Sequence, residues 1–101
     1  MPTRHPSHLQ DTALRYFYEV AQCGTVSAAS ANLHVASSAI SRQISGLEAQ
    51  LGTPLFERHA RGMVPTAAGV IVAQLVRRIS LDAEQAGDAI NALESLRAGT
   101  V

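Results

Sequence analysis

The stretch from Leu33 to Glu48 reads Leu-His-Val-Ala-Ser-Ser-Ala-Ile-Ser-Arg-Gln-Ile-Ser-Gly-Leu-Glu. If a helix begins near Ser37, the apolar residues recur at intervals of four, three and four and form one stripe of Ile40, Ile44, Leu47 and Leu51. The opposite side carries short hydroxyls and one guanidinium, contributed by Ser38, Ser41, Arg42 and Ser45. Such a side fits the major groove of B-DNA, which admits a helix and offers hydrogen-bond acceptors along its floor. The stretch therefore predicts a recognition helix over residues 37–51.

The residues before this helix predict a shorter helix and a turn. Ser27 is a favourable N-cap residue, and the alanine-rich sequence that follows to Leu33 favours a helix that packs closely. Residues 34–36 then form a turn before a second N-cap at Ser37. This arrangement is that of a helix-turn-helix motif over about residues 25–44. Because the turn lacks the glycine that is frequent there, a solvated helix in a small bundle stays open as the alternative at this point.

A further helix is expected at the beginning of the chain. Asp11 suits the N-cap position of a helix from Thr12 to about Gln22, which Gly24 ends. Its apolar stripe of Leu14, Phe17 and Ala21 predicts a core-facing side. Cys23, in the last turn, is expected to act as a small buried hydrophobe.

After Gly52 the helical period is lost. Short extended segments lie on either side of Arg61-Gly62, which has the composition of a tight turn, and prolines flank them at positions 54 and 65. This pattern predicts a β-hairpin with a basic tip.

Thr66 suits the N-cap of a helix of about 30 residues that runs to Arg97. Apolar residues alternate in steps of four and three along it, which predicts a heptad seam. The seam consists of Val72, Val76, Ile79, Ala83, Ala86, Ile90 and Leu93. A helix about 45 Å long cannot bury this seam against a head of about 60 residues. We therefore expect it to pair with the same helix of a second copy; the alternative is a helix that folds back on its own head.

Composition limits the possible functions. The chain has 101 residues, 47% of them apolar, and a formal net charge of zero, which argues mildly against nucleic acid. All eight cations are arginines, however, and Arg42, Arg58 and Arg61 lie in segments without an acid. No apolar run approaches the length of a transmembrane helix, and no signal peptide is evident. With a single cysteine, which excludes an intramolecular disulfide, these features fit a cytoplasmic protein.

Neither catalysis nor metal binding is expected. The single cysteine, the histidines and the scattered acids show no spacing typical of nucleophilic or acid–base catalysis, and there is no glycine-rich phosphate loop. His5 and His8 are expected to be solvated in a flexible leader rather than to bind a metal ion. We therefore predict a protein that is not an enzyme and has no cofactor.

Taken together, the motifs resemble the amino-terminal domain of LysR-type bacterial transcriptional regulators, over roughly residues 9–96. The residues that carry the resemblance are Leu14-Arg-Tyr-Phe17, Gly24, Ala29, Leu33-His-Val35, Ala39-Ile-Ser-Arg-Gln-Ile44, Leu47-Glu48, Leu51-Gly52, Pro54-Leu-Phe-Glu-Arg58, Arg61-Gly62 and Thr66-Ala-Ala-Gly69. As a set they are far more specific than a helix-turn-helix alone.

The resemblance implies a mainly α fold, with a winged helix-turn-helix of three helices and a short β-hairpin wing, followed by a long dimerisation helix. The expected divisions are a leader over 1–8, the DNA-binding domain over 9–66, the linker helix over 67–97 and a tail over 98–101. It also implies a homodimer with the linker helices antiparallel, and a tetramer as a possible longer form. A small-molecule effector would bind only through a carboxy-terminal domain that these residues do not include, so we expect an excised domain.

The expected DNA contacts lie on the recognition helix, the wing and two helix N-termini. They are Ser27, Ser37, Ser38, Ser41, Arg42, Ser45, Arg58, Arg61 and Thr66. Ser37, Ser38, Ser41, Arg42 and Ser45 would lie in the major groove, and Ser27 and Thr66 would position phosphates. Arg61, at the wing tip, would enter the minor groove.

The chain departs from the family pattern at residues 36–38, where Ser-Gln-Pro or Ser-Gln-Ser is usual. Ser37 replaces the glutamine that often reaches a base edge, and Ala36 removes a usual capping hydroxyl, for which Ser37 or Ser38 could substitute. Serine cannot pair bidentately with adenine as glutamine can, so the preferred operator is expected to differ.

One rival function remains at this stage, a dimeric helical module that binds a protein through its serine face without binding DNA. It leaves the basic hairpin tip unexplained. Binding measured at several salt concentrations separates the two, because phosphate contacts impose a steep dependence on salt.

Overall fold

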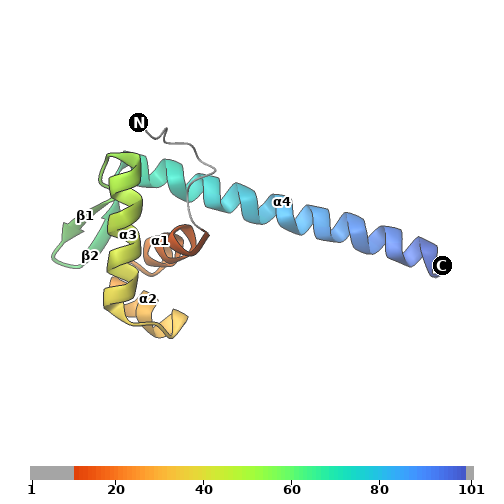
Figure 1. The fold of residues 1–101 in the computed structure, drawn as a ribbon, viewed down its shortest axis with the longest axis horizontal. Coiled ribbons are helices and arrows are strands. Elements are labelled where there is room, and N and C mark those ends of the chain that lie inside the picture. The colour runs from red at the N-terminus through yellow and green to blue at the C-terminus, as the bar shows by residue number, and fades with distance from the viewer. Residues whose placement is uncertain (1–10, 100–101) are drawn as a thin grey trace.

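The computed structural model describes residues 11–99 and has four helices and one hairpin in that range (Figure 1). The elements are α1 (Asp11–Cys23), α2 (Val26–Leu33), α3 (Ser37–Leu51), β1 (Phe56–His59), β2 (Gly62–Pro65) and α4 (Ala67–Arg97). The order confirms the predicted winged helix-turn-helix followed by a long helix. The predicted leader with His5 and His8 lies outside the described residues, as does the end of the tail.

The helix starts differ from the predicted caps. Thr25, in an extended conformation, is the N-cap of α2, and its Oγ1 accepts a hydrogen bond of 3.0 Å from the Ala28 amide. Ser27 therefore lies inside the first turn. Ala36 is the N-cap of α3 and makes no side-chain capping bond, so neither Ser37 nor Ser38 replaces the missing hydroxyl. Asp11 is already helical, so it belongs to the first turn of α1 rather than preceding it.

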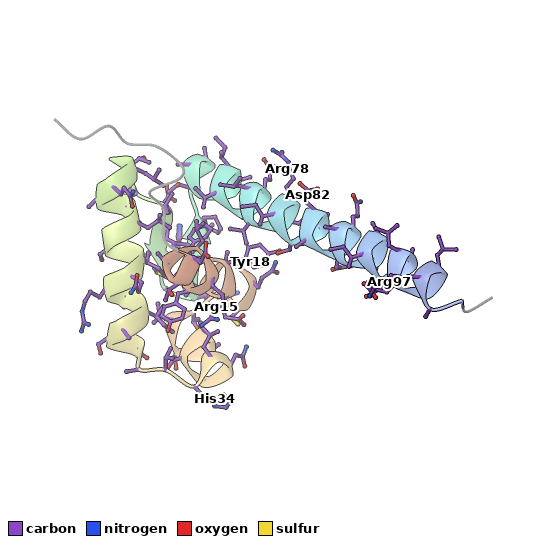
Figure 2. All side chains as sticks on the ribbon, turned by 45° about the vertical axis from the view of Figure 1, so that its right-hand side comes forward. Arg15, Tyr18, His34, Arg78, Asp82 and Arg97 are labelled. Atoms are coloured by element: carbon purple, nitrogen blue, oxygen red, sulfur yellow. The ribbon has the colours of Figure 1, made fainter. Side chains whose placement is uncertain are left out.

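The turn between α2 and α3 is closed without glycine. His34 has a left-handed backbone with φ 58°, and its amide donates to the Ser30 carbonyl. The Val35 amide also donates to the Ser30 carbonyl, and the Ser30 hydroxyl donates to the Val35 carbonyl. Ser30 thus holds the turn from both sides, while the side chain of His34 points outward at the end of the head (Figure 2).

The core of the head lies where α1 crosses α3. Phe17, Val20 and Ile40 are fully buried, and Leu47 is almost fully buried. The ring of Phe17 lies 5.1 Å from that of Phe56 on β1, so the same core also holds the wing. Burial of each large side chain contributes about 1.5–3 kcal/mol. The predicted apolar stripe of α3 is confirmed except at its end, where Leu51 is 37% exposed.

The wing is tied to the turn between α1 and α2. β1 and β2 pair antiparallel with His59 opposite Gly62, which leaves Ala60 and Arg61 as the two-residue tip. The Met63 amide donates to the Gly24 carbonyl at 2.8 Å. A Cβ on Gly62 would lie 2.3 Å from that carbonyl oxygen, so only glycine allows this close approach.

α4 begins against the head and then extends beyond it (Figure 1). The radius of gyration is 17.1 Å, compared with about 13 Å for a compact domain of this length. Val72 is 8% exposed and belongs to the core of the head, which corrects its assignment to an intermolecular seam. The heptad pattern predicted an apolar side of α4, but it did not show whether a given residue packs against the head of its own chain or against a second copy. Beyond Ile79, the apolar side of α4 is open to solvent.

No helix within residues 11–99 combines the length and apolar character needed to span a membrane.

Candidate nucleic-acid interface

The exposed side of α3 is narrow because its side chains are small. Five predicted contact residues, Ser37, Ser38, Ser41, Arg42 and Ser45, are all exposed on α3. Gly46 is exposed beside them, and no atom lies within 4 Å of where its Cβ would be. Arg42 is the one charged residue among the exposed residues of α3, so a single guanidinium projects from a surface of hydroxyls and backbone.

The wing brings a second arginine, Arg58, beside this helix. Along β1 the side chains alternate, which places Phe56 and Arg58 on one face and Glu57 and His59 on the other. Arg58 and the α3 residues Ser41 and Ser45 line one hollow of about 150 Å³ between α3 and the wing. The structure thus brings Arg58, one of the expected DNA contacts, close to Ser41 and Ser45 of α3.

A second hollow, of about 320 Å³, lies between the start of α2 and the wing. Ser27 lines it on one side, and Arg58, His59 and Arg61 line it on the other. A serine and two arginines around one hollow are suited to an anionic group such as a backbone phosphate. The DNA-facing surface, so named for the DNA contacts that the sequence predicts, consists of Ser27, Ser37, Ser38, Ser41, Arg42, Ser45, Arg58 and Arg61.

The charges of this surface are not cancelled within the protein. Across residues 11–99, none of Arg42, Arg58 and Arg61 forms an ion pair. Glu57, next to Arg58 in the sequence, pairs with His59 at 3.3 Å, and Glu48, which lines the first hollow with Arg58, accepts from the Leu55 amide at 2.7 Å through a carboxylate oxygen. A protein with zero net charge therefore presents a locally basic surface.

Thr66 does not join this surface. Its hydroxyl donates to the Pro54 carbonyl at 2.8 Å and accepts from the Gly69 amide at 3.0 Å, and its amide donates to the Leu55 carbonyl. The side chain therefore has no donor left for a phosphate, contrary to the role predicted for Thr66. Its place is at the junction between the wing and α4.

Sequence reasoning did not identify Glu48, which ties the end of α3 to the segment before the wing, or Thr25, which caps α2. Thr25 could have been identified as the N-cap because threonine is a favoured capping residue, but Ser27 offers a capping hydroxyl as well. Glu48 gave none, since the carboxylate accepts a bond from a residue beyond the end of its own helix.

Cys23 is half-buried in a polar cluster rather than in the core, which corrects the expected packing role. Its Sγ donates to Glu19 Oε2 at 3.2 Å, and Asn32 Nδ2 donates to both of these atoms at 3.1 Å. The hydrogen bond to Glu19 and partial desolvation raise the pKa of the Cys23 thiol. A thiol kept protonated is a poor nucleophile. Among residues 11–99, no group of three or more histidine, cysteine or acidic residues has the geometry of a metal site.

Comparison with known proteins gives a consistent result. The family described as bacterial regulatory helix-turn-helix protein, lysR family, matches residues 12–70. The chain is 45% identical over 75 residues to the transcriptional regulator TcbR of Pseudomonas sp. (strain P51), a match that covers 74% of this chain and 26% of TcbR. It is 35% identical over 88 residues to the nitrogen assimilation regulatory protein nac of Escherichia coli (strain K12), covering 87% of this chain and 29% of nac. The chain thus spans about a quarter of the length of such relatives.

Solved structures extend the likeness to the fold. The CbnR DNA-binding domain in complex with DNA matches with a TM-score of 0.72 and 41% identity, over 84% of this chain and 98% of that one. The BenM DNA-binding domain in complex with benA site 1 DNA matches with a TM-score of 0.73 and 29% identity, over 81% and 95%. Both matches cover nearly the whole of the solved domain.

Proposed function

This chain belongs to the lysR family of bacterial regulatory helix-turn-helix proteins, and from that premise we propose that it binds operator DNA as a homodimer. Its activity is that of a DNA-binding transcriptional regulator. In the proposed complex α3 lies in the major groove and the wing tip reaches the adjacent minor groove. The observation that carries the proposal is the DNA-facing surface, on which α3 and the wing expose three arginines that form no ion pair within residues 11–99.

Each part of this surface suits a different part of the duplex. The short hydroxyls of α3 let the helix backbone approach the base edges, and Arg42 is long enough to reach guanine acceptors. Ser27 and Arg58 line the hollow beside the wing, which is the proposed position of a backbone phosphate. Arg61 stands at the hairpin tip, and a planar guanidinium is favoured in a narrow minor groove.

The exposed side of α4 supports dimerisation. Ile79, Ile90 and Leu93 are 52%, 58% and 66% exposed, and they follow one another along the part of the helix that leaves the head. Figure 2 shows this part of α4 with its side chains reaching into open space. A row of exposed apolar residues along one side of a helix is typical of a surface that a partner covers. The partner that matches it most simply is the same helix of a second copy.

The charges of α4 favour an antiparallel pair. Arg77 and Arg78 lie in its first half, whereas four acids, Asp82, Glu84, Asp88 and Glu94, lie further along. In an antiparallel pair centred on residues 83–86, Asp88 and Glu94 lie near Arg77 and Arg78 of the second copy, whereas parallel helices would place each acid beside its own counterpart. With the two-fold axis between Ala83 and Ala86, Ile79 would face Ile90 of the second copy and the small alanines would meet at the centre.

Binding of the 101-residue chain to DNA at several salt concentrations tests the proposal. A duplex selected from a random pool is the probe, and the expected result is a steep fall of affinity with salt, since cations on phosphates release counterions. Arg58→Ala should reduce the slope, whereas Arg78→Ala, which removes the same charge from α4, should leave it nearly unchanged. If no duplex is selected above background, the chain does not bind DNA by itself and the proposal is wrong.

A further inference from the structure

The recognition helix and the long helix are connected in two ways, through α1, on which both pack, and through the segment that follows Gly52. α3 packs on α1 and α2, and α4 packs on α1 and β2. Residues 53–55 link α3 to β1, and the segment is hydrogen-bonded both by Glu48 of α3 and by Thr66, the N-cap of α4. Its geometry therefore affects how α3 is oriented relative to α4.

On the α3 side, one residue holds the segment through its backbone and its side chain. The Glu48 carbonyl accepts from the amides of Gly52, at 2.8 Å, and Thr53, at 3.2 Å. Its carboxylate accepts from the Leu55 amide at 2.7 Å. A charged acceptor makes this last bond stronger than a neutral one.

On the α4 side, Thr66 holds the same segment. Its amide donates to the Leu55 carbonyl at 3.0 Å and its hydroxyl donates to the Pro54 carbonyl at 2.8 Å. The same hydroxyl accepts from the Gly69 amide and so caps α4. Glu48 binds the amide of Leu55 and Thr66 binds its carbonyl, so a single buried residue is held from both helices.

The first turn of α4 fits tightly on this segment. A Cβ on Gly69 would lie 2.1 Å from the Leu55 carbonyl oxygen, so α4 rests on the backbone of residue 55 with no space for a side chain. α4 also packs on the head through Ala68, Val72 and Ala73, and apolar contacts of this kind are largely non-directional. Hydrogen bonds are directional and thus better suited to fix an angle.

We propose that Glu48 and Thr66 are positioning residues that set the angle between α3 and α4, and thereby the spacing of DNA half-sites that the dimer accepts. This inference rests on the proposed function as a dimeric DNA-binding protein. A small change in this angle moves the head far, since about 17 residues of α4, or roughly 26 Å, separate the start of the helix from the proposed two-fold axis. A tilt of about 10° would displace one head by roughly 5 Å relative to that axis, which exceeds the rise of about 3.4 Å per base pair.

Matched variants at both residues test the proposal. Thr66→Val keeps the shape but loses both hydroxyl bonds, and its control Thr66→Ser keeps them. Glu48→Leu loses the acceptor for the Leu55 amide, and its control Glu48→Gln retains an oxygen that can accept that bond. The probes are duplexes with two selected half-sites whose spacing differs by one or two base pairs, together with a duplex that has a single half-site.

We expect Thr66→Val and Glu48→Leu to lower the preference for the best spacing at least threefold, with affinity for the single half-site within twofold of wild type. The serine and glutamine controls should keep the wild-type preference. If the two residues acted on stability alone, Thr66→Val and Glu48→Leu would lower the thermal midpoint without changing the preference for the best spacing, and that result would overturn the inference. If Glu48→Leu does not fold, the threonine pair decides the question.

A second measurement does not depend on DNA. In a Cys23→Ala background, Ala31→Cys places one spin label on an exposed position of each head, and pulsed electron resonance gives the distance between the two labels in the dimer. Thr66→Val should broaden this distance distribution and Thr66→Ser should not. An unchanged distribution in Thr66→Val would overturn the inference even if DNA binding is confirmed. A wild-type chain that binds DNA without any spacing preference would also overturn it, whereas a chain that binds no DNA would contradict the proposed function.

Discussion

Arg42 is the residue on which sequence reading by α3 depends most. It is the one charged residue among the exposed residues of α3, and the serines around it are too short to reach far into a groove. Arg42→Ala should cost on the order of 1–3 kcal/mol on the preferred site and relax discrimination at one base pair. Competition binding with single-base variants of the operator measures both effects. An equal loss on every sequence would instead assign Arg42 to a phosphate.

Cys23 provides a prediction on pH. The hydrogen bond to Glu19 raises the pKa of the thiol, so at pH 8 it should react with iodoacetamide more slowly than a free thiol does. Glu19→Gln removes the charge and should speed the reaction at the same pH. The pKa of Cys23 is higher in the folded protein than in the unfolded chain, so the protonated thiol stabilises the folded state. This stabilisation is complete below the pKa of the unfolded chain and is lost as pH rises through the pKa of the folded protein. Rates of iodoacetamide reaction measured from pH 7 to 10 for wild type and Glu19→Gln test this prediction, and equal rates in the two proteins would contradict it.

At the scale of the element, α3 contains an unfavourable residue on its exposed side. Gly46 lies in the interior of the helix with open space around it, and glycine there costs about 0.5–1 kcal/mol relative to alanine. Gly46→Ala should therefore raise the thermal midpoint by a few degrees. The same methyl group would stand one turn from Arg42 on the DNA-facing side, so the affinity for DNA should fall. A rise in stability with full affinity would show that the duplex does not approach α3 at this point.

The wing supplies the second element-scale prediction. Arg61, at the tip, is expected to favour A·T-rich flanks, where the minor groove is narrow and its negative potential is enhanced. Arg61→Ala should reduce the preference for A·T over G·C flanks, and Arg61→Lys should weaken binding although the charge is kept. Affinities on operators that differ only in their flanks are the measurement. If Arg61→Ala keeps the wild-type preference, the wing does not read groove width.

For the whole molecule, the prediction concerns assembly. The free part of α4 leaves Ile79 and Ile90 more than half exposed, and in the proposed dimer each would face the other across the two-fold axis. Replacement of both by Asp would place unpaired charges in an apolar contact and should give monomers. Light scattering at tens of micromolar checks this. Leu81→Asp, on another side of the same helix, is a matched control that should remain dimeric, and a wild-type chain that is itself monomeric would contradict the proposal.

Much of the architecture could be predicted from the sequence because it depends on local patterns. The apolar period of α3, the alanine-rich α2 and the Arg61-Gly62 turn are each readable from a few neighbouring residues, since side-chain spacing along a helix or strand is fixed by backbone geometry. The exposure of the α3 serines and of Arg42 followed directly from that period. The resemblance to the LysR family rested on the same residues and was confirmed by comparison.

Other features could be decided only by the tertiary structure, because they depend on which distant segments meet. Thr25 and Ser27 both offer a capping hydroxyl, and only the backbone conformation before α2 selects Thr25. Val72 fits the heptad pattern as well as Ile79 does, yet the head buries Val72 and leaves Ile79 exposed. Thr66 was expected to serve DNA, and its hydroxyl instead joins α4 to Pro54. A periodic sequence determines which side of a helix is apolar or polar, but the partner of that side is determined by chain segments whose positions no local period specifies.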